Sequence, residues 1–315
     1  MEEKKYRWMF PHVKGTMTTA GMMRMVLLAL LPAAVFGTFH FGFRALLHMV
    51  VCLVTCVLTE FTFEAFADRP LAVTDGSAAV TGMLLALLLP VGAPLWMGFL
   101  GGVFAIAVIK MPIGGLGKNR LNPALSACAV LMLAFPGYMK DYSFGTYGAK
   151  TLLGQLLQGQ TVDPFSMLWG GTNGSIGAAS ALMLLVGALI LLGAGVIRLR
   201  IPAAVTAAFT LTLFLFSGRG VDQLFFTTQI LGGGFFLVTF FMATDTVTSP
   251  ITPGGQILYG VLIGILAGIF RLCKVEEGVI YAVLIANLVV PFLEEFTVPK
   301  AFGYRKMVRV SQKRR

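Results

Sequence analysis

MMRMVLLALLPAAVFGTFH, residues 22–40, is followed after three residues by RALLHMVVCLVTCVLTEFTFEAF, residues 44–66. About 20 apolar residues cross the hydrocarbon core of a bilayer, and each of these runs has that length. The whole chain of 315 residues has the same character, with 57% hydrophobic and 12% charged residues. Soluble proteins carry about 25% charged residues. The sequence therefore predicts a multi-pass membrane protein with no soluble catalytic domain.

Further apolar runs predict an all-α polytopic membrane protein of about ten transmembrane helices. The third and fifth runs are short and contain Gly, Ser and Asn, which is typical of broken helices. Such breaks are tolerated only where protein or a cavity satisfies the backbone. The spans are expected at residues 22–40, 44–66, 76–92, 94–111, 121–136, 175–195, 201–217, 225–243, 256–272 and 278–296.

The distribution of Lys and Arg predicts that both termini are cytoplasmic. In that topology the inner segments hold 18 of the 24 basic residues, Lys110 and Lys118 among them. An excess of Lys and Arg marks the cytoplasmic side, and an even number of spans follows. The predicted organisation is an N-terminal membrane half at 1–136, an extracytoplasmic loop at 137–174, a C-terminal membrane half at 175–297 and a basic cytoplasmic tail at 298–315.

The net charge of +10 does not indicate nucleic acid, because the basic residues gather at the chain ends and in short loops rather than on one soluble face. The four cysteines lie in apolar runs, and the three histidines are scattered. No metal site is therefore predicted.

A weak internal sequence similarity suggests that the two halves of five spans are related. Each half opens near a Gly-Ser element, at Gly76-Ser77 and at Gly174-Ser175, and each later carries a polar element that ends in Pro. Repeats with an odd number of spans would be inverted in the membrane.

Four polar elements interrupt the apolar background. In the first, Thr74–Gly82, Asp75 or Ser77 is either a plain helix N-cap or part of a helix start that faces an anion such as a phosphate. The second, Gly114–Ala124, is either a cytoplasmic turn or a more specific site built on its two Asn. The third, Gly170–Gly177, is a Gly-rich segment before the sixth span, and a loop without a ligand explains it equally well.

The fourth element surrounds Asp245 with hydroxyl side chains, including Thr248 and Ser249. An acid near membrane depth is a candidate functional residue because its burial is expensive. A cation site, a ligand hydroxyl and a capped helix end all fit this pattern.

At these four elements the chain resembles the D subunit of the Rnf complex, an ion-translocating ferredoxin:NAD⁺ oxidoreductase. The homologous B subunit of the sodium-translocating NADH:quinone oxidoreductase shares the pattern. The resemblance implies ten helices in two related halves, an FMN joined through its phosphate to a Thr after the fifth span, and a second, non-covalent flavin such as riboflavin. The residues expected to bind cofactor are Asp75, Gly76, Ser77, Thr81, Asn119, Asn122, Gly174 and Ser175, with Asp245, Thr248 and Ser249 as candidates for an ion or ligand.

The expected covalent site departs from the family pattern Ser/Thr-Gly-Ala-Thr. Here Gly148-Ala149 match, Lys150 occupies the usual Thr position, and Thr151 comes one residue later. The resemblance leaves Thr151 as the candidate for FMN attachment and Thr146 as the fallback, or no covalent flavin at all.

The expected function is electron relay through flavin, coupled to Na⁺ or H⁺ movement in a bacterial or archaeal cell (inner) membrane. The chain has no Cys sets for iron–sulfur clusters and no G-x-G-x-x-G fingerprint. Its partners are therefore the lipid bilayer and the other membrane and peripheral subunits of the complex, and we expect no complete activity from the chain alone. The alternatives are a subunit of the quinone-reducing complex and a solute permease or channel without a redox role.

The topology is tested with reporter fusions. A reporter after Gly159 should report the extracytoplasmic side, and one after Arg315 the cytoplasm, because the basic residues favour that orientation. A cytoplasmic signal from the Gly159 fusion would contradict ten spans.

Overall fold

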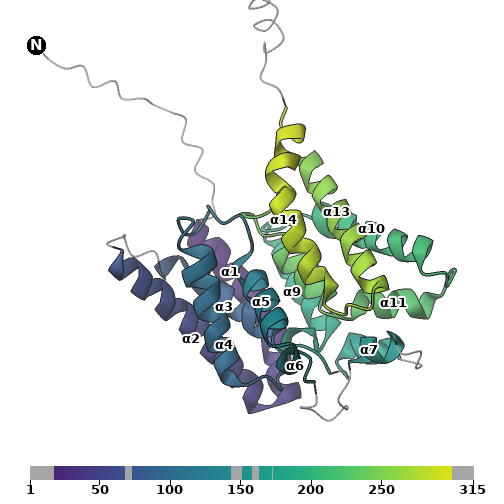
Figure 1. Ribbon diagram of the computed structural model, residues 1–315, viewed down its shortest axis with the longest axis horizontal. Coiled ribbons are helices and arrows are strands. Elements are labelled where there is room, and N and C mark those ends of the chain that lie inside the picture. The colour runs from purple at the N-terminus through teal and green to yellow at the C-terminus, as the bar shows by residue number, and fades with distance from the viewer. Residues whose placement is uncertain (1–17, 68–72, 143–150, 158–162, 172, 300–315) are drawn as a thin grey trace, which may run out of the picture.

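The computed structural model describes residues 18–67, 73–142, 151–157, 163–171 and 173–299. Within these ranges the fold is all-helical, with no β-strand and one isolated bridge between Pro90 and Ser175. A helix lies in every one of the ten predicted ranges. Figure 1 shows α1 to α5 on one side of the molecule and α10, α11, α13 and α14 on the other.

Among the described residues, four helices are long and apolar enough to cross a membrane: α1 (Thr19–Phe41), α2 (Phe43–Phe66), α13 (Pro253–Leu272) and α14 (Gly278–Thr297). A bent pair would be a fifth span. It joins α11 (Gln223–Leu231) to α12 (Phe235–Leu237) and the π-helix η4 (Val238–Met242), with a bend of 58°. The number of ten spans stays a prediction.

The remaining apolar helices are shorter: α3 (Ser77–Leu88), α4 (Leu95–Val103) with the π-helix η2 (Phe104–Lys110), α5 (Pro123–Ala134), α9 (Ala181–Gly193) and α10 (Arg200–Phe216). The predicted shortness of the third and fifth spans is confirmed, because α3 and α5 have 12 residues each. Twelve helical residues extend about 18 Å, well below the thickness of about 30 Å of a hydrocarbon core. These helices therefore end inside the protein.

The long connection at 137–174 is not a plain loop. It contains α7 (Leu152–Leu157) and α8 (Pro164–Trp169), and α6 (Pro136–Met139) begins directly before it. Asp163 caps α8 by accepting a hydrogen bond from Phe165 N at 3.1 Å. Short capped helices explain how a sequence rich in Gly and polar residues still folds here.

Glycines let α13 pack closely against α10. Gly260, Gly264 and Gly268 recur at every fourth position of α13 and so lie on one face. A Cβ at Gly264 would lie 2.5 Å from Val205 O and 2.6 Å from the Ala208 Cβ. Small residues at this spacing allow backbones to approach closely in membrane helix pairs.

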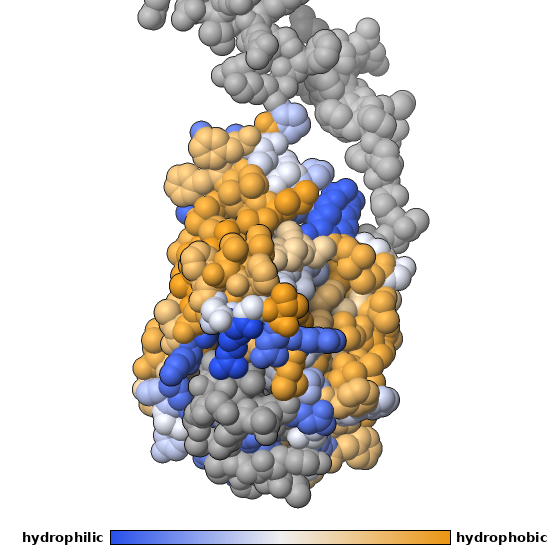
Figure 2. Space-filling model, turned by 90° about the vertical axis from the view of Figure 1, so that its right-hand side faces the viewer, coloured by the Kyte–Doolittle hydropathy of each residue, from blue (hydrophilic) through white to orange (hydrophobic). Residues whose placement is uncertain are grey.

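The surface of α10, α11 and α13 matches a lipid environment. Figure 2 shows this face as largely apolar, interrupted by a hydrophilic band. Phe216 of α10 is 71% exposed, and Leu211 and Leu215 are also exposed. Large exposed apolar surfaces mark contact with membrane or protein.

The close packing of α10 and α13 makes Gly264 intolerant of a side chain. Gly264→Ala should destabilise the protein by about 1–3 kcal/mol, because the two helices must move apart. Thermal unfolding in detergent measures this effect. The control is Gly193→Ala in α9, where a Cβ meets nothing within 4 Å. Equal melting temperatures for the two variants would contradict this packing.

Candidate functional site

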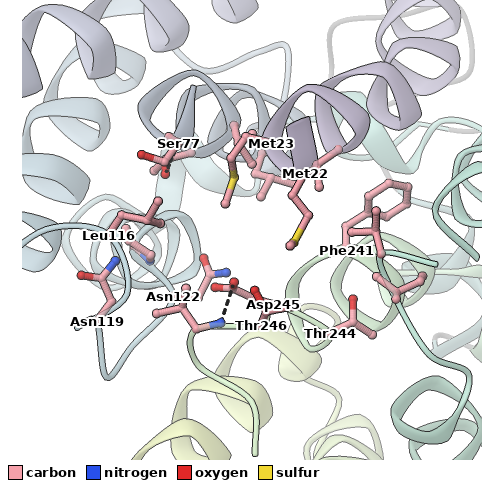
Figure 3. Close-up of a pocket in the computed structure, with 18 of the residues that line it drawn as sticks. Met22, Met23, Ser77, Leu116, Asn119, Asn122, Phe241, Thr244, Asp245 and Thr246 are labelled. Carbon is pink, nitrogen blue, oxygen red and sulfur yellow. Dashed lines mark hydrogen bonds between the residues drawn. The ribbon is translucent and has the colours of Figure 1, made fainter. Parts of the chain in front are cut away.

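Three of the four polar elements line one cavity of about 80 Å³, which we call the Asp245 cavity. Its walls come from α1, α3, the end of η2, the turn before α5, the end of α9 with the residues after it, and η4 with the segment that follows it. Figure 3 shows Met22 and Met23 of α1 pointing toward Asn122 and Asp245. The polar residues that line it are Ser77, Thr81, Lys110, Asn119, Asn122, Thr244, Asp245 and Thr246.

The first polar element builds the start of α3 beside this cavity. Asp75 accepts a hydrogen bond from Ser77 N at 2.7 Å, and Gly76 has a φ of +81°, which favours glycine. Ser77 and Thr81 line the cavity, and Thr81 Oγ1 donates to Ser77 O at 3.0 Å. Asp75 and Gly76 therefore shape the helix start, whereas Ser77 and Thr81 face the cavity.

The second element supplies two Asn side chains. Asn122 caps α5 by accepting a hydrogen bond from Leu125 N at 3.2 Å, and Pro123 occupies the first helical position. Asn119 is buried, and its Oδ1 has no hydrogen-bond partner among the described residues. An unpaired buried acceptor is expensive unless a ligand or water satisfies it.

The fourth element folds around its acid. Asp245 accepts hydrogen bonds from Val247 N at 3.2 Å and from Thr248 Oγ1 at 3.4 Å, and Ser249 N donates to Asp245 O at 3.0 Å. Thr248 and Ser249 are buried behind Asp245 and do not line the cavity. Thr248 holds the carboxylate and Ser249 N holds the main-chain carbonyl of Asp245, with Asp245 itself on the cavity wall.

A buried ion pair completes this end of the site. Lys110 Nζ donates to Glu60 Oε1 and to Ser77 Oγ, each at 2.5 Å. Lys110 is 1% exposed, although its position at the end of an apolar run predicts a place among the cytoplasmic residues. Glu60 carries no sequence signal beyond being a rare acid inside an apolar run.

The third element lies elsewhere. Ile176 N donates to Leu89 O at 3.0 Å, and Ser175 pairs with Pro90, so this segment meets the far end of α3. Gly174 and Ser175 are thus about one length of α3 away from Ser77. The structure does not bring them to the Asp245 cavity.

A second cavity, of about 390 Å³, is lined by Thr151 and is called here the Thr151 cavity. Its apolar wall includes Met132, Leu133, Pro136 and Met139. Its charged and hydroxyl side chains come from both halves of the chain: Lys140, Tyr142, Thr151, Lys274, Glu276, Glu277 and Tyr281.

The Thr151 hydroxyl is already engaged. Thr151 Oγ1 donates to Glu276 Oε2 and accepts from Gly154 N at 2.9 Å, which caps α7. A phosphate ester at this oxygen would lose the donated bond and would meet the Glu276 carboxylate. The arrangement therefore fits FMN attachment only after Glu276 turns away. The fallback, Thr146, lies outside the described residues.

Glu277 lies in the turn between α13 and α14, directly before α14. Burial raises the pKa of its carboxyl from 4.5 to about 7, and the nearby Arg271 guanidinium partly opposes this shift. Burial, together with Glu277, also raises the pKa of Tyr142 well above its usual value. Glu277 is thus poised to exchange a proton near neutral pH.

The two cavities lie at the two ends of α5. Asn122 and Pro123 at its start line the Asp245 cavity, and Met132 and Leu133 near its end line the Thr151 cavity. Ten helical residues correspond to about 15 Å.

In the described part of the chain, no group of three His, Cys, Asp or Glu residues could hold a metal ion.

Short helices that meet inside a membrane bundle, with hydroxyl, amide and charged side chains around a cavity at their ends, define a polytopic membrane protein with an internal candidate ligand site. Residues 9–303 match the model of the NQR2, RnfD, RnfE family. The chain belongs to this family.

Relatives of known name cover nearly the whole chain. The chain is 39% identical to the D subunit of the Na⁺-translocating ferredoxin:NAD⁺ oxidoreductase complex of Acetobacterium woodii, over 94% of this chain and 95% of that protein. It is 37% identical to the proton-translocating counterpart of Clostridium ljungdahlii, with the same coverage. The D subunit of the ion-translocating oxidoreductase complex of Methanosarcina acetivorans is 34% identical, over 93% of this chain and 95% of that protein.

The raised pKa of Glu277 predicts a pH-dependent stability. The folded state holds the proton more tightly than the unfolded state, so this contribution is complete below about pH 4.5 and is lost as the pH rises through about 7. Between pH 5 and 8 the melting temperature of the wild type should fall more steeply than that of Glu277→Gln. The control Glu295→Gln, at an exposed position, should keep the wild-type slope. A wild-type slope in Glu277→Gln would contradict the assignment.

Proposed function

We propose that this chain is the D-type subunit of an ion-translocating ferredoxin:NAD⁺ oxidoreductase complex, in which it relays electrons through flavin and contributes to Na⁺ or H⁺ translocation. The observation that carries this proposal is the Asp245 cavity, where three separate polar elements of the sequence converge. The names of the relatives support the assignment to this complex rather than to the quinone-reducing one.

The donor and acceptor set of the Asp245 cavity suits a flavin. Ser77, Thr81 and Asn122 offer hydroxyl and amide groups to a ribityl chain, and Asn119 Oδ1 lacks a partner. Asp245 adds a carboxylate acceptor, which lies beside Asn122. These are the residues that would hold the non-covalent flavin, in the manner expected of polar groups that orient a ligand in a largely apolar pocket.

The volume of the Asp245 cavity limits whether a flavin ring can enter it. About 80 Å³ holds only a few waters, since one water occupies about 30 Å³ in the liquid. A flavin ring therefore requires side chains to move. Met22 and Met23 point into the cavity, and unbranched thioether side chains repack at low cost.

A bound flavin supplies the electron-transfer chemistry, because its ring accepts and passes on electrons. The chain supplies orientation and electrostatics. Ser77 and Asn122 are fixed by the capped starts of α3 and α5, and Asp245 is fixed by Val247 N and Thr248. Met22, Met23 and Phe241 exclude water from the same space.

Thr151 is the residue to which we assign a covalent FMN, if one is attached. The cavity beside it has room for a ring, and Lys140 and Lys274 provide positive charge near a phosphate. Attachment requires Glu276 to release the hydroxyl. The two flavin positions would then lie at the two ends of α5.

The coupling ion does not follow from the relatives, because two of similar identity are named for different ions, Na⁺ and H⁺. The remaining features of the proposal are ten spans in two related halves, cytoplasmic termini, and a place in a bacterial or archaeal cell membrane. Ferredoxin and NAD⁺ chemistry would belong to partner subunits.

The non-covalent site is tested by flavin content. The full chain, purified in detergent, should release a flavin on denaturation. Asn119→Ala and Asp245→Asn should each weaken binding about tenfold, since one hydrogen bond to a ligand contributes about 1–1.5 kcal/mol. Gln223→Ala, an exposed amide on α11, is the control. A wild type without flavin absorbance would favour a permease without a redox role.

The Asp245 variant also separates its three interpretations. Loss of flavin indicates a ligand contact. Normal flavin with lost ion-dependent turnover in the complex indicates a cation site, for which carboxylate and hydroxyl oxygens are suitable ligands. A lower melting temperature alone indicates a cap.

Covalent attachment is tested by fluorescence of the denatured chain in a gel, after co-expression with its flavin transferase. If Thr151 carries FMN, Thr151→Ala should abolish the band, and Glu276→Ala should increase its intensity because the acceptor that engages the hydroxyl is removed. If the fluorescent band persists in Thr151→Ala and is lost in Thr146→Ala, the FMN is attached to Thr146. A wild type without a band would mean that this subunit works without covalent flavin.

A further inference from the structure

Lys110 is the one charged side chain of the Asp245 cavity that the sequence motifs did not include. It sits at the end of the π-helix η2, where Met111 N donates to Ile106 O at 2.9 Å, five residues back. One extra residue in a turn rotates the residues after it by about 100°. The π-helix thereby turns Lys110 inward, and such π-segments are frequent at functional sites.

Two partners fix the direction of the Lys110 side chain. Its Nζ donates to Glu60 Oε1 and to Ser77 Oγ, so α2 and the start of α3 hold it from two sides. An ammonium has three N–H donors. The third has no partner in the part of the chain that the structure describes. Because Lys110 is 1% exposed and lines the cavity, a ligand in the cavity can accept that third bond.

The cavity offers a cationic donor together with acceptors. Lys110 Nζ donates beside Ser77, and Asn119 and the Asp245 carboxylate, which also line the cavity, can accept. The pyrimidine end of a flavin carries carbonyl acceptors next to an N–H donor, and extra electron density collects there on reduction. Charge near this end of the ring tunes its electronics.

We propose that Lys110, fixed by Glu60 and Ser77, faces the pyrimidine end of a flavin in the Asp245 cavity and raises its reduction potential. This inference rests on the proposed flavin in that cavity. A positive charge stabilises the reduced, electron-rich ring more than the oxidised ring. Glu60 positions Lys110, and within the ranges that the structure describes the Glu60 Oε2 has no hydrogen-bond partner.

A purely structural ion pair is the competing explanation, because Lys110 also links α2, α3 and η2. Breaking a buried pair on one side leaves an uncompensated charge and is strongly destabilising. The test therefore includes the double variant Glu60→Gln/Lys110→Gln, which removes both charges. Lys118→Gln is the control, since Lys118 is exposed in the neighbouring turn and does not line the cavity.

The measurement is a spectroscopic redox titration of the non-covalent flavin in the purified full chain, together with flavin content and melting temperature. Lys110→Gln and the double variant should lower the midpoint potential. If the protein's affinity for the reduced flavin falls tenfold relative to its affinity for the oxidised flavin, the midpoint potential falls by about 30 mV for a two-electron couple. Lys118→Gln should keep the wild-type potential. Loss of flavin from Lys110→Gln and from the double variant, while both still melt cooperatively, also supports a contact between Lys110 and the flavin. In that case Lys110→Arg and Lys118→Gln should retain the flavin.

A lower melting temperature with an unchanged potential would show that the pair is only structural and would overturn the inference, while the flavin site itself would stand. A wild type that holds no non-covalent flavin would overturn the proposed site and this inference together. Flavin content measured before the titration separates these two results.

Discussion

The rest of this structure depends on one constraint: helices too short to cross a bilayer leave free backbone groups inside the protein, and each group needs a partner. The start of α3 is satisfied by Asp75, that of α5 by Asn122, and that of α9 by Ser180. The far end of α3 is closed by a bond from Ile176 N to Leu89 O. Caps of this kind place polar side chains at membrane depth. The same residues or their neighbours then line a cavity, so the groups that satisfy the helix ends also form a candidate ligand site.

Charged side chains also gather at the two ends of α5. At the start of α5, Lys110 and Glu60 form a pair that is almost completely buried, with Asp245 across the cavity. Beyond the end of α5, Glu276, Glu277 and Lys274 meet Lys140 and Thr151. A buried pair contributes little to stability once desolvation is counted, because the cost of removing two ions from water offsets their attraction. Its presence beside a cavity is therefore more informative about function than about folding.

Sequence reasoning predicted the helical class and the approximate positions of the long apolar helices, because long apolar runs carry a strong signal. It did not predict the short helices α7 and α8 in the connection at 137–174. It also identified Ser77, Asn119, Asn122 and Asp245, which the structure brings together. It missed Lys110, because the inward rotation comes from a π-turn that no periodicity indicates. It missed the Thr151–Glu276 contact as well, since 125 residues separate the two. Gly174 and Ser175 share a local pattern with Gly76 and Ser77 but lie at the opposite end of α3, and only the tertiary fold could show this.

Because α5 runs from one cavity to the other, its number of residues fixes how the linings of the two cavities are oriented relative to each other. An α-helix neither stretches nor compresses appreciably, and it advances about 100° and 1.5 Å per residue. Insertion or deletion of a single residue between Pro123 and Met132 would rotate the lining of one cavity relative to the other by nearly a third of a turn. Substitutions in the middle of α5 need only preserve packing, whereas a change in residue number would misalign both cavities at once. In this helix, selection is expected to act on the count of residues at least as strongly as on their identity.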